Sequence, residues 1–195
     1  MMTRKLAIVR PALVLLLAFT LLTGIVYPVF CTLVLQVVFP HQADGSLVRS
    51  GDRVIGSELI GQSFTSPGYF WGRASAATPP YNPAASQGSN MSAAHPALYD
   101  AVKARVEALH RADPKNTAEI PVDLVTASGS GLDPDISLAA ALYQVPRVAR
   151  VRRLEERAVS DLVYRFSRGK LLGVWGELRV NVLELNMALD AQGGG

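Results

Sequence analysis

Cysteine and histidine are scarce in this sequence: Cys31 is the only cysteine, and His41, His95 and His110 are the only histidines among 195 residues. An intrachain disulfide needs two cysteines and a thiolate metal site needs several, so both are excluded. A serine hydrolase would need a histidine partner for its nucleophile. His95 directly precedes a predicted helix start and His110 lies in the last turn of that helix, which are ordinary structural positions. We therefore predict no catalytic residue and no metal site.

Nucleotide and metal motifs are also missing. The sequence contains no Walker A pattern and no zinc or EF-hand spacing. The run TASGSG at 126–131 superficially resembles a nucleophile elbow, but G-x-S-x-G is not met around either serine. Its glycines could cradle a phosphate before a helix, or they could simply form a turn, and Asp133 would repel an anion there. We therefore expect no cofactor bound by this chain itself.

Acidic residues are absent from the first 40 residues, which carry Arg4, Lys5 and Arg10. The remaining 16 basic residues are balanced by 16 acidic ones, so the net charge of +3 comes from the N-terminal end alone. A nucleic-acid-binding surface would need its basic residues clustered in the folded domain. The charge distribution therefore excludes nucleic acid as a partner and indicates membrane topology.

Charge is missing altogether from residues 12–39, ALVLLLAFTLLTGIVYPVFCTLVLQVVF. About 20 apolar residues in a helix cross the hydrocarbon core of a bilayer, so this stretch predicts a transmembrane helix over 11–39. The basic residues precede it, so residues 1–10 are expected in the cytoplasm and residues 40–195 form an extracytoplasmic, periplasmic domain. A cleaved signal peptide is the alternative, but its apolar region is shorter and ends in a small-x-small site.

The anchor contains one predicted irregularity, at 23–28 (TGIVYP). Pro28 removes a backbone N–H and crowds the preceding turn, so a kink or break is expected. Gly24 would allow the backbone of another helix to approach closely. Alternatively, glycine and proline are simply tolerated in membrane helices. The segment is predicted as a contact with a partner helix, through Gly24, Tyr27 and Pro28.

Beyond the anchor, residues 47–59 predict a hairpin with a turn at 50–52. Residues 61–93 are rich in Gly, Pro, Ser and Ala, which is typical of a loop. Disordered segments are poor in aromatic residues, so the aromatics of this segment favour a long ordered loop. These aromatics could belong to the core of the domain or to a partner interface, for which Phe70 and Trp71 are the candidates.

Helices dominate the rest of the predicted domain. One helix begins at Pro96 and ends at Asp113-Pro114, and a strand is expected over 120–125 (IPVDLV). Asp133 is predicted to cap a helix that starts at Pro134 and is closed by Pro146. A further helix then covers 146–168, and Asn181 with Glu184 forms a capping box for the last one. The predicted fold class is α+β, with one transmembrane helix followed by a single helix-rich domain.

Six segments of the sequence together carry a resemblance to a known family. They are TGIVYP, LIGQSFTSPGYFWGR, YNPAASQGSN, VTASGSGLDPDIS, ALYQVPRVAR and VNVLELNMAL. In this order they resemble the motif string of the C subunit of Kdp-type potassium-transporting ATPases, over residues 23–189. Each segment alone is weak evidence, but six in register are specific.

The resemblance implies an accessory, non-catalytic subunit of a high-affinity potassium import complex in the bacterial inner membrane. Its partners would be a channel-like potassium-translocating subunit and a P-type ATPase subunit, with a small additional subunit possible. The family is also described as a catalytic chaperone that raises the ATP affinity of the ATPase subunit, and the implicated glutamine matches Gln144. ATP would then act only through the complex. The alternative is a stand-alone membrane-anchored envelope enzyme or sensor domain.

Overall fold

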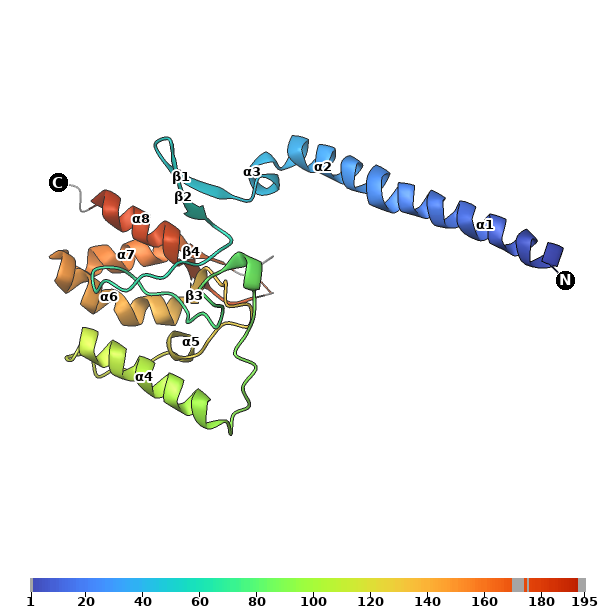
Figure 1. Ribbon diagram of the computed structural model, residues 1–195. Coiled ribbons are helices and arrows are strands. Elements are labelled where there is room, and N and C mark those ends of the chain that lie inside the picture. The colour runs from blue at the N-terminus through green and yellow to red at the C-terminus, as the bar shows by residue number, and fades with distance from the viewer. Residues whose placement is uncertain (1, 170–173, 175, 193–195) are drawn as a thin grey trace. The chain divides into compact units, whose positions relative to one another are not determined.

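A computed structural model describes residues 2–169, 174 and 176–192 of the chain (Figure 1). It divides into two compact units, Met1–Leu47 and Val48–Gly195, which are described separately below. The first unit is helical and the second mixes helices with short strands. The predicted fold class, helix and sheet with one long apolar N-terminal helix, agrees with this architecture.

The first unit is built around an almost continuous apolar helix. Helix α1 (Met2–Leu21) runs through a π-helical turn, η1 (Leu22–Val26), into α2 (Tyr27–Val38), and the short α3 (Pro40–Ala43) follows. Residues Ile8–Val38 are long and apolar enough to cross a membrane. Because Pro28 has no N–H to donate to the preceding turn, the regular α-helical hydrogen bonding is interrupted there, and the backbone just before it forms a π-helical turn. The irregularity predicted at 23–28 is confirmed as this π-helical turn.

The predicted hairpin is confirmed where the second unit begins: β1 (Leu47–Ser50) pairs with β2 (Arg53–Ser57). The following segment, 61–93, has no regular structure except the 3-10 turn η2 (Pro83–Ala85) and an isolated bridge between Ala74 and Ala127. Helix α4 (Pro96–Ala112) then follows, as expected. His95 caps this helix, because its Nδ1 accepts the N–H of Ala97 at 3.2 Å.

The strand predicted over 120–125 is wrong: Val122–Val125 form a single helical turn, α5. The β-branched valines favour a strand only where a neighbouring strand offers a ladder. Here side chains settle the conformation instead. The Thr126 hydroxyl donates to the Val122 carbonyl (2.8 Å), and the Asp123 carboxylate accepts both the N–H (2.8 Å) and the hydroxyl (3.2 Å) of Ser137.

The helix predicted to start at Pro134 is also wrong, because Asp135–Ser137 form strand β3. Asp133 accepts the Asp135 N–H at 3.1 Å, which is a turn and not a helix cap. Strand β3 pairs antiparallel with β5 (Arg179–Asn181), which also pairs with β4 (Ser167–Arg168). Helix α6 (Leu138–Arg152) begins one element later, with Ser137 as its cap: the Ala140 N–H donates to the Ser137 hydroxyl at 3.0 Å.

The prediction that Pro146 closes a helix is wrong, because Pro146 lies inside α6. The chain instead breaks at Arg153, whose φ of 58° is left-handed. The Leu154 N–H bonds the Ala149 carbonyl (2.9 Å), which makes a Schellman C-cap with arginine where glycine is usual. The helix predicted over 146–168 is therefore two helices, α6 and α7 (Glu156–Phe166).

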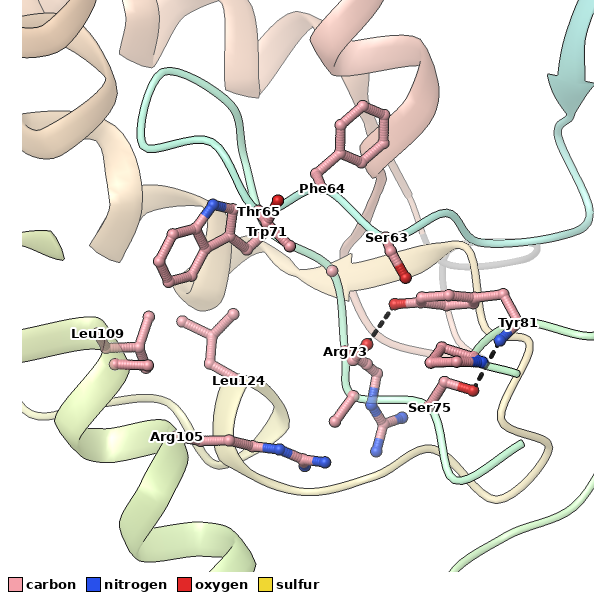
Figure 2. Close-up of a pocket in the computed structure, with 14 residues that line it drawn as sticks. Ser63, Phe64, Thr65, Trp71, Arg73, Ser75, Tyr81, Arg105, Leu109 and Leu124 are labelled. Atoms are coloured by element: carbon pink, nitrogen blue, oxygen red, sulfur yellow. Dashed lines mark hydrogen bonds between the residues drawn. The ribbon is translucent and has the colours of Figure 1, made fainter. Parts of the chain in front are cut away.

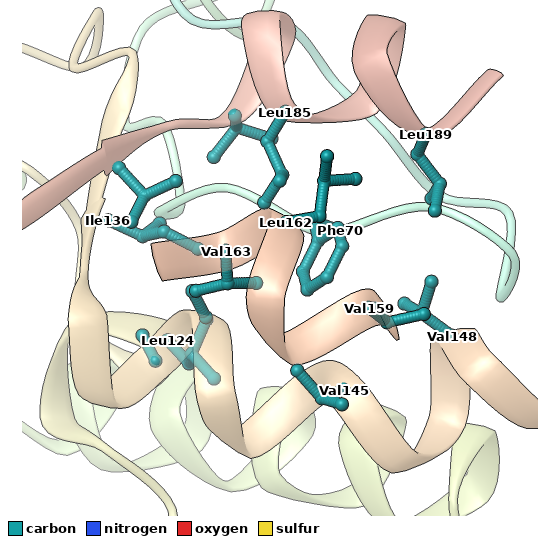
Figure 3. Packing of buried hydrophobic residues seen from close by; sticks show 14 of the residues in the cluster. Phe70, Leu124, Ile136, Val145, Val148, Val159, Leu162, Val163, Leu185 and Leu189 are labelled. Atoms are coloured by element: carbon teal, nitrogen blue, oxygen red, sulfur yellow. The ribbon is translucent and has the colours of Figure 1, made fainter. Parts of the chain in front are cut away.

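Helix α8 (Val182–Gln192) follows β5 directly, and its predicted cap is confirmed: Asn181 Oδ1 accepts the Glu184 N–H at 3.2 Å. The Glu184 carboxylate does not close the second half of the box and pairs with Arg168 instead. Helices α6, α7 and α8 enclose the core, together with the ring of Phe70 (Figure 3). Figure 3 shows this ring among side chains of these helices, which are Val148, Val159, Leu162, Leu185 and Leu189.

Candidate functional site

Residues 66–72, here called the core-crossing segment, run beside the packed helices without any strand partner. The Phe70 side chain is 0% exposed in the core, and Gly68 is also buried. Buried backbone N–H and C=O groups need hydrogen-bond partners, and a segment without helix or ladder must find them elsewhere. The structure supplies them from side chains of α6 and α8.

Two buried amides hold consecutive residues of the core-crossing segment. From α8, Asn186 Oδ1 accepts the Phe70 N–H (2.8 Å) and its Nδ2 donates to the Phe70 carbonyl (3.0 Å). From α6, Gln144 Oε1 accepts the Trp71 N–H (2.8 Å) and its Nε2 donates to the Trp71 carbonyl (3.1 Å). Each amide presents one donor and one acceptor, as a neighbouring strand would do. We call this pair the amide clamp.

The hydrogen-bonding capacity of Gln144 is filled. Besides its two bonds to Trp71, its Nε2 donates to the Ala140 carbonyl (3.2 Å) and its Oε1 accepts from Arg147 Nη2 (2.6 Å). An amide offers two donors and two acceptor lone pairs, and all four are used. Its side chain is also nearly inaccessible, with the residue 1% exposed. In this conformation Gln144 has no polar group left for a nucleotide.

Arg147 extends the amide clamp by one helical turn of α6. Its guanidinium donates to the carbonyls of Pro67 and Tyr69 (3.0 Å to the latter) and lies 4.5 Å from the centroid of the Trp71 ring. Burial lowers the pKa of Arg147 to about 10, which still leaves it charged at neutral pH. A buried charge must be stabilised by its surroundings, and here carbonyls, the Gln144 oxygen and an aromatic face do so.

A second arginine of α6 fixes the outer end of the same segment. Arg152 donates through Nε to the Gly68 carbonyl (2.6 Å), pairs with Asp190 (2.7 Å) and stacks over the Tyr69 ring (4.5 Å). The Tyr69 hydroxyl donates to the same carboxylate at 3.1 Å. The core-crossing segment is therefore bonded to α6 or α8 at each residue from Pro67 to Trp71.

The sequence pointed to only part of this arrangement. The resemblance points to Gln144, which lies within α6. Asn186, Arg147 and Arg152 were not singled out. The available signal was their spacing: Arg147 and Gln144 share one face of a helix at i and i+3, and Asn186 stands inside an otherwise apolar helix.

Phe70 and Trp71, the two partner-interface candidates of the segment, lie differently. The Phe70 ring is in the core, the other possibility that the sequence left open, whereas Trp71 is half-buried and its Nε1 donates to the Ser66 carbonyl (2.9 Å). Gly24, Tyr27 and Pro28 belong to the separate N-terminal unit. Tyr27 is exposed, and a Cβ added at Gly24 would meet nothing within 4 Å.

The glycine-rich run 126–131 serves as a structural turn. Its Ser128 hydroxyl accepts the Gly131 N–H (2.9 Å), and its Ser130 carbonyl accepts the Ser86 hydroxyl (3.0 Å). Gly131 has a left-handed φ of 68°, and an added Cβ would lie 2.6 Å from the Gln87 carbonyl. Over residues 2–169, 174 and 176–192, no three His, Cys, Asp or Glu side chains are grouped so that they could hold a metal ion.

Comparison with known proteins places these features in a family. Residues 9–191 match the family model described as KdpC, K+-transporting ATPase, c chain. A potassium-transporting ATPase KdpC subunit of Methylococcus capsulatus is 59% identical over 93% of this chain and 96% of its own. The KdpC subunits of Sorangium cellulosum (60% identical over 95% and 98% of the two chains) and of a Janthinobacterium species (57%, 93% and 96%) are similarly related.

Proposed function

Because the chain belongs to the KdpC family of potassium-transporting ATPase subunits, we propose that it is the accessory, non-catalytic subunit of a high-affinity, ATP-driven potassium import complex. In this proposal it assembles with a channel-like potassium-translocating subunit and a P-type ATPase subunit and stabilises both. The family match over residues 9–191 carries the proposal, because it covers both the apolar helix and the domain. A small additional subunit is compatible with it.

A non-catalytic role is supported by the chemistry of the sequence. It holds no Walker A pattern and no phosphorylatable aspartate motif of P-type ATPases. Among the described residues, the polar side chains that are buried most deeply, Gln144, Asn181 and Asn186, all bond backbone groups of the same chain. ATP is therefore bound and hydrolysed by the partner, and this subunit acts through assembly.

Location in the bacterial inner membrane is proposed from the anchor and its flanks. The apolar stretch Ile8–Val38 follows Arg4 and Lys5, so the N-terminus is cytoplasmic and the domain from residue 40 is periplasmic. A reporter that is active only in the periplasm, fused after Gly195, should be active, and a cytoplasmic reporter should be silent. The opposite pattern would refute this orientation.

Any effect of this subunit on ATP affinity is proposed to be indirect. A periplasmic Gln144 is separated from the cytoplasmic nucleotide by the membrane, and its hydrogen bonds are already used within the domain. Coupling free energies between distant sites are typically about 1–3 kcal/mol, or about 5–150-fold in affinity. A catalytic-chaperone effect of this size is compatible with coupling through the assembled complex.

Affinity purification in mild detergent tests the proposed function. The tagged chain should recover the two large potassium-transport subunits, and alone it should hydrolyse no ATP. Gly24→Leu should reduce that recovery while the chain still inserts, because a leucine would hold a partner helix away from the π-helical turn. Ala18→Leu, a matched enlargement in α1, is the control. ATP hydrolysis by the isolated chain, or recovery of no transport subunit, would overturn the proposal.

A further inference from the structure

A cavity of about 430 Å³ lies beside the core-crossing segment, and no function proposed above uses it (Figure 2). Its walls come from residues 63–65 and 71–75, from Pro80 and Tyr81, from α4 and from α5. The volume falls in the range of cavities that hold small organic molecules, which are about 300–1,000 Å³. All of its lining residues belong to the second unit of the chain.

The two ends of this cavity differ in chemistry. Figure 2 shows Trp71, Leu109 and Leu124 at one end, and Arg73, Arg105, Ser75 and Tyr81 at the other. Leu109 and Leu124 are buried core residues, so the first end is a firm apolar wall. A molecule that fits both ends must therefore carry an apolar body and a polar group.

Charge decides which polar group fits. Arg73 is neutralised by Asp133, whose Oδ2 lies 3.1 Å from its Nη1, and Asp133 does not line the cavity. Arg105 forms no ion pair within the part of the chain that the structure describes, and its one hydrogen bond goes to the Val125 carbonyl (3.2 Å). The polar end thus carries one uncompensated positive charge.

The other polar groups at this end do not supply the negative charge that Arg105 lacks. The Tyr81 hydroxyl is occupied in donating to the Arg73 carbonyl, and the Ser75 hydroxyl donates to the Gly131 carbonyl (2.7 Å). Arg105 is half-buried, and burial lowers its pKa. Arginine has five N–H donors and prefers carboxylate or phosphate oxygens that accept two of them.

We propose that this cavity is a binding site for a small amphipathic organic monoanion. Its carboxylate pairs with Arg105, and its apolar body lies against Trp71, Leu109 and Leu124. Neither Gln144 nor Asn186, the two amides of the amide clamp, lines the cavity.

Phenylacetate is a suitable probe because it joins one carboxylate to one ring. Binding of radiolabelled phenylacetate to the full chain in nonionic detergent is measured by equilibrium dialysis, with phenylacetamide and acetate as competitors. We expect saturable binding in which both competitors are at least tenfold weaker, because one lacks the charge and the other lacks the apolar body. Binding should also weaken as salt rises.

Variants locate the site. Arg105→Gln should weaken phenylacetate binding about tenfold or more, since a hydrogen bond to a charged group is lost. Arg105→Lys should retain part of the affinity because the charge remains. Arg111→Gln, an exposed arginine of the same helix, is the matched control and should bind as the parent does. Thermal melts verify that each variant is folded, and the competitor comparison needs no variant at all.

Three results would overturn the proposal. One is the absence of saturable binding at millimolar phenylacetate. Another is equal competition by phenylacetamide, which would make the cavity a site for neutral apolar molecules. The third is binding to the free chain that disappears in the assembled complex, which would show that a partner's side chain occupies the cavity.

Discussion

The core-crossing segment and helices α6–α8 contribute to the same core in opposite ways. In the helices, the backbone satisfies itself through its own ladder, and side chains are free to pack. In the core-crossing segment, the N–H and C=O groups of Phe70 and Trp71 and the carbonyl of Tyr69 are instead bonded by Asn186, Gln144 and Arg147, which the helices supply. The comparison shows that the backbone of a buried segment without regular structure can be hydrogen-bonded by side chains, which then replace the backbone–backbone hydrogen bonds of a helix or sheet.

This difference has an energetic consequence. When an apolar side chain of a helix is truncated, the hydrogen bonds of the helix backbone remain. When a side chain of the amide clamp is truncated, two backbone groups lose their partners, and for Asn186 both groups are buried. An unsatisfied buried polar group costs about 1–3 kcal/mol. The segment should therefore depend on a few polar residues, and the helices on the sum of many apolar contacts.

The largest expected effect tests whether the core-crossing segment belongs to the core. Phe70→Ala should lower the free energy of unfolding by about 3–5 kcal/mol, as for other buried aromatics, because its ring is fully buried among α6–α8. Denaturant unfolding of the full chain in mild detergent measures it. Tyr99→Ala, on the exposed face of α4 (71% exposed), should change stability by less than about 0.5 kcal/mol. A Phe70→Ala value as small as that of Tyr99→Ala would place the segment outside the core.

Breaking the amide clamp should have the next largest effect. Gln144→Ala and Asn186→Ala should each cost about 2–4 kcal/mol. Asn186→Ala leaves the buried N–H and C=O of Phe70 unpaired, and Gln144→Ala leaves the N–H and C=O of the half-buried Trp71 unpaired and removes an acceptor of the buried Arg147. The control is Gln87→Ala, in which an exposed amide with one hydrogen bond to the Ala76 carbonyl is lost. Melts of the three variants should separate the buried pair from the exposed residue, and equal melting temperatures would contradict the clamp.

Helix caps should give an intermediate effect. Ser137→Ala removes the hydroxyl that caps α6 and donates to Asp123, and it should cost about 1–2 kcal/mol. Ser160→Ala, inside α7, removes a hydroxyl of the same size from a helix interior and is the matched control. A stability change at Ser160 equal to that at Ser137 would mean that α6 does not begin where the structure places it.

The smallest effect is expected from the exposed ion pair of α4. Glu107 Oε2 lies 3.7 Å from Arg111 Nη1, and both side chains are mostly exposed. Glu107→Gln should therefore lower the free energy of unfolding by at most about 0.3–0.5 kcal/mol. The loss should disappear in high salt, whereas the loss for Gln144→Ala should not. A salt-insensitive effect at Glu107 would indicate a contact beyond this ion pair.

Periodicity and capping residues were enough to predict the local elements. The apolar run, the proline of the π-helical turn, the hairpin, helix α4 and the Asn181 cap all depend on neighbours in sequence. Contacts from afar decided the rest. The valines of 122–125 favour a strand, but the segment forms a helical turn in which Asp123 is bonded to Ser137. Strand β3 forms because β5 lies beside it and pairs with it.

The site was predicted less fully than the fold for the same reason. Gln144 was reached through resemblance, but its role depends on a backbone segment 73 positions away in the sequence. No local pattern reveals that Asn186 meets Phe70, or that Arg147 faces Trp71. These contacts depend on how three helices pack around one segment. The residues next to each of them in the sequence carry no sign of that packing.

The ATP requirement of the assembled complex tests the central claim most directly, namely that Gln144 acts as a structural clamp and not as a nucleotide ligand. The measurement is the apparent KM for ATP of purified complexes that carry Gln144→Ala or the matched Asn186→Ala, at equal subunit content and below both melting temperatures. Both variants remove one amide of the same clamp, so we predict that their KM values stay equal to each other within about twofold, well below the 5–150-fold of a typical coupling. A rise in KM for Gln144→Ala alone, in a fully assembled complex, would contradict the account.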